Sequence, residues 1–179
     1  MRNALALARK GRETVRSNPM VGAIITDDTG SVRGTGWHYG PGTPHAEVHA
    51  IQAAKDSGLT DFSGTTLYVT LEPCCHTGRT PPCTDLILKT GIRRIVCGMT
   101  DPNPLVGGKG LRILRDAGCT IRNNVLEKEC RALNTAFVTF HEKKRPYCTL
   151  KTASSLDGKI TAPNGESRWI TGEASRQDV

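Results

Sequence analysis

The chain has 179 residues, of which 24 are Lys or Arg and 17 are Asp or Glu, so its formal net charge is +7. No apolar run approaches the roughly 20 residues that a transmembrane helix needs, so we expect no membrane partner. The N-terminus lacks the apolar stretch of a signal peptide, and seven cysteines without such a signal predict free thiols in a cytoplasmic protein. Aromatic residues make up only 4%, too few for base-stacking surfaces, which favours a small phosphorylated ligand over nucleic acid.

Hydrophobic periodicity and turn residues predict helices and strands in alternation along the first 144 residues. The first part reads as a helix at 3–12, strands at 21–26 and 32–37, a helix at 45–57 and a strand at 65–71. The second part reads as a helix from 81–82 to about 90, a strand at 94–98, a helix at 108–117, a strand at 119–122 and one long helix at 126–143. Strands alternating with helices predict a layered α/β/α domain around a central sheet.

The character of the chain changes after Pro146. A β-rich run at 147–152 is followed by polar loops and by the start of a helix near Gly172. So short a segment cannot bury a core of its own. We therefore divide the chain into one domain at 1–144 and the opening piece of a second domain at 145–179.

Three residues in the first domain have the chemistry of a catalytic zinc site. His45 begins a predicted helix, Cys74 follows a strand, and Cys83 comes nine residues later at the start of the next helix. One imidazole and two thiolates suit tetrahedral zinc, and three protein ligands leave the fourth position for water. Glu47 lies two residues after the histidine, where it can move protons between that water and a substrate. The order His-x-Glu and then Pro-Cys is typical of zinc-dependent deaminases, although their second cysteine usually follows after two residues rather than eight.

The remaining cysteines do not fit this ligand set. Cys75 could compete with Cys74, but adjacent residues of an extended segment point in opposite directions, so we assign the ligand to Cys74. We interpret four other cysteines as small packed hydrophobes: Cys97, Cys119, Cys130 and Cys148.

The stretch 70–83, TLEPCCHTGRTPPC, is more specific than the general pattern. It resembles the deaminase domain of the bifunctional riboflavin-biosynthesis deaminase/reductase family. The resemblance extends to SNPMVG at 17–22, GWH at 36–38, PHAEV at 44–48 and DPNP at 101–104. KTASSLDGK at 151–159 and GESRWIT at 165–171 resemble the beginning of that family's reductase domain. The resemblance implies a three-layer α/β/α sandwich of the cytidine-deaminase-like type with a mixed central sheet.

The resemblance also implies a reaction and a set of functional residues. The reaction is hydrolytic removal of an amino group from 2,5-diamino-6-ribosylamino-4(3H)-pyrimidinone 5′-phosphate, giving 5-amino-6-(5-phosphoribosylamino)uracil and ammonia. The zinc ligands would be His45, Cys74 and Cys83, for one Zn²⁺ per chain, with Glu47 as the proton shuttle. The positions that match substrate contacts of the family are Asn18, His38, His76 and Arg79. We expect no NADPH binding, because the reductase domain is incomplete.

Two alternatives remain open from the sequence. A nucleic-acid deaminase, for example one acting on tRNA adenosine, shares the metal chemistry and is compatible with the basic charge. A non-catalytic zinc fold, or a fragment that is inactive without its reductase partner, would keep the ligands without the activity. The sequence does not determine the oligomeric state, and a homo-oligomer is compatible with it.

Overall fold

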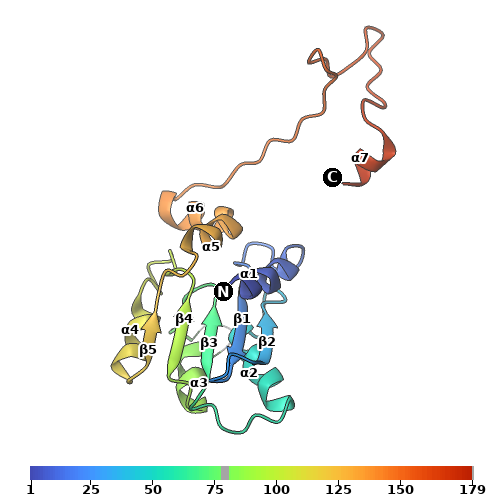
Figure 1. The fold of residues 1–179 in the computed structure, drawn as a ribbon. Helices are drawn as coiled ribbons and strands as arrows, with labels where there is room; N and C mark the ends of the chain where they lie inside the picture. Colours follow the sequence, from blue (N-terminus) through green and yellow to red (C-terminus); the bar gives the residue numbers. More distant parts are fainter. Residues whose placement is uncertain (78–80, 179) are drawn as a thin grey trace. The chain divides into compact units, whose positions relative to one another are not determined.

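The computed structural model of the chain describes residues 1–77 and 81–178. Its contacts divide the chain into two units, the first from Met1 to Tyr147 and the second from Cys148 to Val179 (Figure 1). All of the strands and six of the seven α-helices of the described residues belong to unit 1.

Unit 1 is built on a sheet of five strands. The strands are β1 (Gly22–Thr26), β2 (Val32–Trp37), β3 (Thr66–Val69), β4 (Arg94–Cys97) and β5 (Thr120–Arg122). They lie in the order β2-β1-β3-β4-β5. Strand β1 runs antiparallel to both of its neighbours, whereas β3, β4 and β5 are parallel to one another. The prediction of a mixed central sheet is therefore confirmed.

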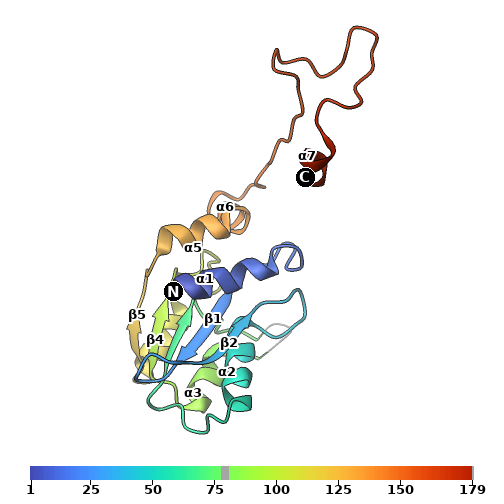
Figure 2. The same ribbon diagram turned by 45° about the vertical axis from the view of Figure 1, so that its right-hand side comes forward.

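Helices cover both faces of this sheet (Figure 2). They are α1 (Arg2–Ala8), continued by the 3₁₀ turn η1 (Arg9–Gly11), α2 (Ala46–Asp56), α3 (Cys83–Thr90), α4 (Lys109–Asp116), α5 (Glu127–Leu133) and α6 (Thr135–Lys143). Two glycines on opposite faces show how closely the layers pack. A Cβ atom on Gly22 would collide with the backbone of α1 at Ala4, and one on Gly36 would collide with the backbone of α2 at Ala46. These positions bring the first residues of α2 close against the sheet.

The core lies between the sheet and its helices. Leu67 and Val69 of β3 and Ile95 and Cys97 of β4 are at most 1% exposed. These four residues alternate along their strands and are paired across β3 and β4, so they form one continuous buried face, whereas Tyr68 and Val96 on the other face are half-buried. The edge strand β2 includes Val32, which is 54% exposed. The central parallel strands thus form a rigid base from which the loop after β3 projects.

Two predicted elements differ in the structure. The single helix predicted at 126–143 is two helices, α5 and α6, because Asn134 leaves the helical backbone at φ −113° and ψ 34°. The strand predicted at 147–152 is not formed, because this segment has no neighbouring strand among the described residues, and a strand needs a partner for its backbone groups. Cys148 is exposed, so the prediction that it is packed is also wrong.

Unit 2 consists of turns and one short helix, α7 (Glu173–Gln177). Its hydrophobic side chains remain exposed, among them Leu150 at 87% and Trp169 at 69%. The guanidinium of Arg176 lies over the ring of Trp169 at 4.1 Å from its centroid. Across the described residues no helix combines the length and the apolar character needed to cross a membrane.

Candidate metal centre and adjoining pocket

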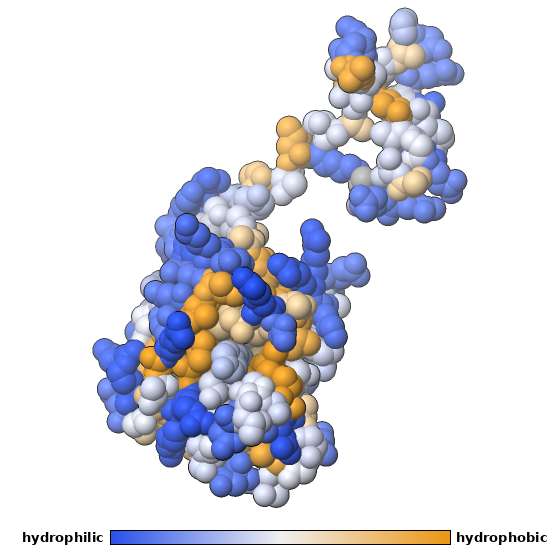
Figure 3. Space-filling view, viewed as in Figure 1, coloured by the Kyte–Doolittle hydropathy of each residue, from blue (hydrophilic) through white to orange (hydrophobic). Residues whose placement is uncertain are grey.

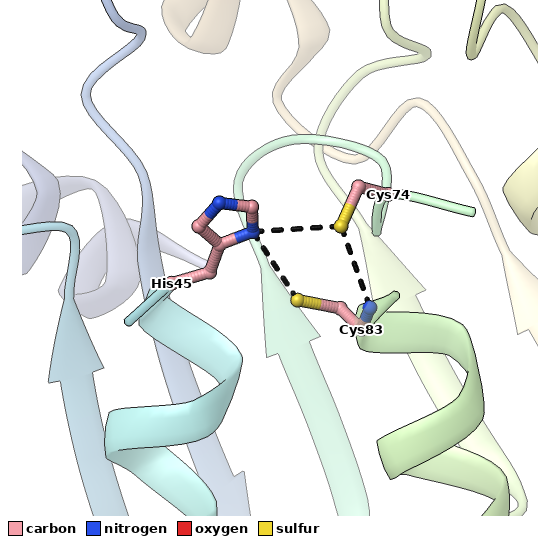
Figure 4. Close-up of side chains that lie close together, drawn as sticks. All are labelled: His45, Cys74 and Cys83. Carbon is pink, nitrogen blue, oxygen red and sulfur yellow. Dashed lines mark hydrogen bonds between the residues drawn. The ribbon is translucent and has the colours of Figure 1, made fainter. Parts of the chain in front are cut away.

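Two helix starts and one strand end bring the candidate ligands together (Figure 4). His45 is the residue just before α2, with extended backbone angles (φ −75°, ψ 166°), and Cys83 is the first residue of α3. Cys74 lies in the loop that follows β3. A proline stands just outside each helix: Pro82 immediately precedes α3, and Pro44 precedes His45.

The three side chains are close enough to share one metal ion. Their ligand atoms all lie within 4.8 Å of one another. His45 Nδ1 is 3.5 Å from Cys74 Sγ and 3.3 Å from Cys83 Sγ. Bond lengths of about 2.05 Å for Zn–N and about 2.3 Å for Zn–S at a tetrahedral angle place nitrogen and sulfur about 3.6 Å apart. The donor set and its spacing therefore fit zinc.

Hydrogen bonding between the two cysteines shifts the pKa values of their thiols in opposite directions. A hydrogen bond from the Cys83 thiol, assisted by His45 and by the backbone N–H of Cys83, lowers the pKa of Cys74 to about 4. The Cys83 N–H lies 3.4 Å from Cys74 Sγ at the start of α3. The same pairing, together with burial, raises the pKa of Cys83 above its usual range. The site therefore favours a thiolate at Cys74, which is the form of cysteine that binds a metal.

Glu47 is buried beside these ligands and is 3% exposed. Burial raises the pKa of its carboxyl to about 7, although electrostatic attraction to His45 acts to lower it. A carboxyl that titrates near neutral pH can both take and give a proton under physiological conditions. The position in the first turn of α2 is set by the local sequence, since the histidine immediately precedes the helix and Glu47 is its second residue.

Cys75 does not join the ligand group, although it is adjacent to Cys74 in sequence. It is partly exposed, and desolvation raises the pKa of its thiol. The geometry thus agrees with the assignment of the metal-facing position to Cys74.

A cavity of about 250 Å³ opens next to the candidate ligands. Its volume lies just below the roughly 300–1,000 Å³ that is typical of pockets for drug-sized ligands. The side chains named from the sequence that line it are His45, Glu47, Cys74, Asn18, His38 and His76. Residues that the sequence did not single out complete the wall, namely Pro19, Val21, Ala46, Leu71, Glu72, Asp101, Asn103, Val106 and Phe137. Of the predicted site residues, only Arg79 lies outside the described residues.

Asn18 and His38 form a pair in this wall. Asn18 Nδ2 is 3.2 Å from His38 Nε2, and His38 Nδ1 is 3.4 Å from the carbonyl oxygen of Pro44. Burial lowers the pKa of His38, which favours the neutral ring. A neutral ring that donates from Nδ1 to Pro44 and accepts at Nε2 from Asn18 satisfies both contacts. The amide oxygen of Asn18 is then the atom that can accept a hydrogen bond from a ligand in the cavity.

Glu72 organises the opposite wall, and sequence reasoning gave it no role. Its carboxylate is 3% exposed and accepts hydrogen bonds from the backbone N–H groups of Asp101 (3.1 Å), Gly108 (2.8 Å) and Leu111 (3.1 Å). Two of these donors lie at the start of α4, where a negative charge is favoured. Glu72 therefore ties the segment before Cys74 to the loop that carries Asp101 and Asn103. The DPNP motif at 101–104 was the available sequence signal for that loop.

The fold and this site define a class of protein. The profile of the family described as the cytidine and deoxycytidylate deaminase zinc-binding region matches residues 1–99, which include His45, Glu47, Cys74 and Cys83. The chain therefore belongs to this family of zinc-binding deaminase domains. A second profile, the RibD C-terminal domain, matches residues 146–179.

Particular relatives share nearly the whole chain. The riboflavin biosynthesis protein RibD of Actinobacillus pleuropneumoniae is 47% identical over 100% of this chain and 46% of its own length. RibD of Escherichia coli is 45% identical over 100% of this chain and 47% of its own length. The chain thus spans about half the length of the curated relatives it matches.

A solved structure from Thermotoga maritima is similar over the same extent. It is named a diaminohydroxyphosphoribosylaminopyrimidine deaminase/5-amino-6-(5-phosphoribosylamino)uracil reductase. It is 46% identical, with a TM-score of 0.91, over 99% of this chain and 50% of that chain. The likeness confirms the cytidine-deaminase-like α/β fold that the resemblance implied.

Proposed function

We propose that this chain catalyses the zinc-dependent hydrolytic deamination of 2,5-diamino-6-ribosylamino-4(3H)-pyrimidinone 5′-phosphate, a step of riboflavin biosynthesis. The products are 5-amino-6-(5-phosphoribosylamino)uracil and ammonia. The observation that carries the proposal is the meeting of one imidazole, two thiols and a buried carboxyl at one cavity. The name of the similar Thermotoga maritima protein includes this deaminase activity.

His45, Cys74 and Cys83 would hold the zinc ion, one per chain. When bound, zinc supplies a Lewis acid that lowers the pKa of a water molecule to roughly 7, so that the water can attack the ring carbon bearing the amino group. Glu47 takes the proton from that water and delivers it to the ring nitrogen. The same carboxyl then carries the second proton to the departing amine, which leaves as ammonia. The net reaction consumes one water and releases one ammonia.

The other walls of the cavity provide recognition. The free oxygen of the Asn18 amide can accept from an amino group of the pyrimidine, while the amide nitrogen is held by His38. His76 lies at the exposed side of the cavity, where its ring can donate to an anionic group. Arg79, whose assignment rests on sequence alone, would provide a guanidinium for the 5′-phosphate.

The test is an ammonia-release assay on the purified full chain with its zinc content measured in parallel. We expect one zinc per chain and turnover of the pyrimidine nucleotide, with no turnover of tRNA. Deamination of tRNA adenosine without turnover of the nucleotide would establish the nucleic-acid alternative. One bound zinc without turnover of either substrate would establish the non-catalytic alternative.

The 145–179 segment is proposed to be the opening piece of a reductase domain. A dinucleotide needs a pocket that buries most of its surface. The hydrophobic side chains of unit 2, such as Leu150 and Trp169, remain exposed at its surface instead (Figure 3). We therefore predict no saturable NADPH binding in a fluorescence titration of this chain. Micromolar binding would contradict that prediction. A cytoplasmic location and a small phosphorylated pyrimidine as the only substrate partner are parts of the same proposal.

A further inference from the structure

The side chain of Asn134 is attached to a segment far away in the sequence. Its Oδ1 accepts a hydrogen bond from the backbone N–H of Met20 at 2.8 Å, and its Nδ2 donates to the Met20 carbonyl oxygen at 2.9 Å. The two residues are 114 positions apart. Asn134 is 5% exposed and Met20 is half-buried, so both bonds are partly shielded from water. One amide thus satisfies both backbone groups of one residue.

Because the amide of Asn134 bonds to Met20, it does not cap the N-terminus of α6. Asn134 is the residue preceding α6, and asparagine is among the preferred residues there because its oxygen can accept from the first N–H groups of the helix. The structure has no side-chain cap bond at this position. Asn134 bonds to Met20 instead of capping α6, which indicates that the position of Met20 is what the contact serves.

The distant end is a wall of the substrate cavity. Asn18, Pro19 and Val21 line the cavity, and Met20 lies between them. The carbonyl oxygen of Val21 accepts from the N–H of His38 at 2.9 Å. Asn134 itself does not line the cavity, although Phe137, one turn further along α6, does. The hydrogen bonds of Asn134 reach the cavity wall at the segment 18–21, which we call the Met20 segment.

We propose that Asn134 is a positioning residue for substrate recognition: its amide holds the Met20 segment so that Asn18 pairs with His38 and presents its oxygen to the cavity. The proposal rests on the proposed function, because it assigns Asn18 to substrate recognition. It explains why the chain breaks the predicted 126–143 helix at Asn134. In a continuous helix the backbone of Asn134 would be helical. Here its backbone angles are φ −113° and ψ 34°, and in this conformation the side-chain amide reaches Met20.

Two substitutions separate positioning from helix capping. Asn134→Ser keeps a good capping residue at the start of α6, but its side chain is too short to make both contacts with Met20. Asn134→Ala loses both abilities. We expect both variants to raise the KM for the pyrimidine nucleotide by about 10-fold, the effect of one lost hydrogen bond, with a smaller change in kcat. Thr135→Ala is the matched control and should leave KM unchanged, since the exposed Thr135 hydroxyl bonds, within the described part of the chain, only to the Ala132 carbonyl of the preceding turn.

A measurement without substrate tests the same contact. Hydrogen exchange of the Met20 amide should accelerate in Asn134→Ser and not in Thr135→Ala, while each protein retains one zinc. Unchanged exchange in the Ser variant would overturn the proposal, whether or not the chain has activity. This readout keeps a failure of the positioning role distinct from a failure of the proposed function, which would instead appear as an inactive wild-type chain.

A double-mutant cycle decides whether Asn134 acts through Asn18. Asn18→Ala should raise KM by itself, and adding Asn134→Ser should raise it little further, because the residue being positioned is already absent. If the fold-increase of KM in the double variant equals the product of the two single-variant increases, the residues act independently. That result would overturn the proposal.

Discussion

Replacing Glu72 by alanine should destabilise unit 1 strongly, although the residue forms no ion pair among the described residues. The carboxylate accepts three backbone N–H groups, and the side chain is almost fully buried. Alanine leaves these donors without an acceptor, and an unsatisfied buried donor costs about 1–3 kcal/mol. It also removes the negative charge at the start of α4.

The size of the effect follows from the burial of each donor. The bond from the Leu111 N–H is buried, so this group loses its partner without access to water. The bonds from Asp101 and Gly108 are partly buried, so water can replace part of them. We therefore expect a loss of about 3 kcal/mol rather than the full sum. For a unit of this size, that corresponds to a melting temperature lower by about 6–12 °C.

Thermal unfolding of the zinc-loaded chain, followed by circular dichroism, measures this change. The matched control is Asp61→Ala, because Asp61 also accepts hydrogen bonds, from the N–H and the hydroxyl of Ser63, but at an exposed site. The control should lower the free energy of unfolding by about 0.5 kcal/mol or less. If Glu72→Ala and Asp61→Ala melt at the same temperature, the burial of an unpaired carboxylate already offsets its hydrogen bonds, and our reasoning is refuted.

Three further predictions concern the thiols and the proton shuttle. Glu47→Gln should retain one zinc and lose about 100-fold or more in kcat, because it removes a proton carrier but no ligand; loss of the metal would contradict the role. Cys75→Ser should keep zinc content and turnover, whereas Cys74→Ser should lose both, and the reverse pattern would move the ligand to the neighbouring residue. In the zinc-loaded chain iodoacetamide should modify the exposed Cys148 and spare the buried Cys97, because burial raises the pKa of the Cys97 thiol, as peptide mass mapping would reveal; equal labelling of these two residues would contradict the buried placement.

The local sequence was sufficient to predict most elements and the three candidate metal ligands that the structure brings together. A histidine before a helix, a carboxyl two residues later and a cysteine at the next helix start depend on helix starts, which short-range signals such as proline and glycine determine. The order His-x-Glu and then Pro-Cys, which is typical of zinc-dependent deaminases, joined these residues into one candidate site. For this reason His45, Glu47, Cys74 and Cys83 could be named before the structure was known.

Contacts between distant parts of the chain could not be predicted in this way. The partners of Glu72, the pairing of Asn134 with Met20 and the entry of Phe137 into the cavity wall join residues whose spacing in the sequence carries no signal. A buried amide or carboxylate can bond to many backbone groups, and only the packing of the layers selects which of them lie within reach. The same reason applies to the two predicted elements that differ. The 126–143 pattern favours one helix, but Asn134 forms hydrogen bonds with the distant Met20 and the helix is interrupted there. The β-rich run at 147–152 has no strand structure because no strand of the described residues lies beside it.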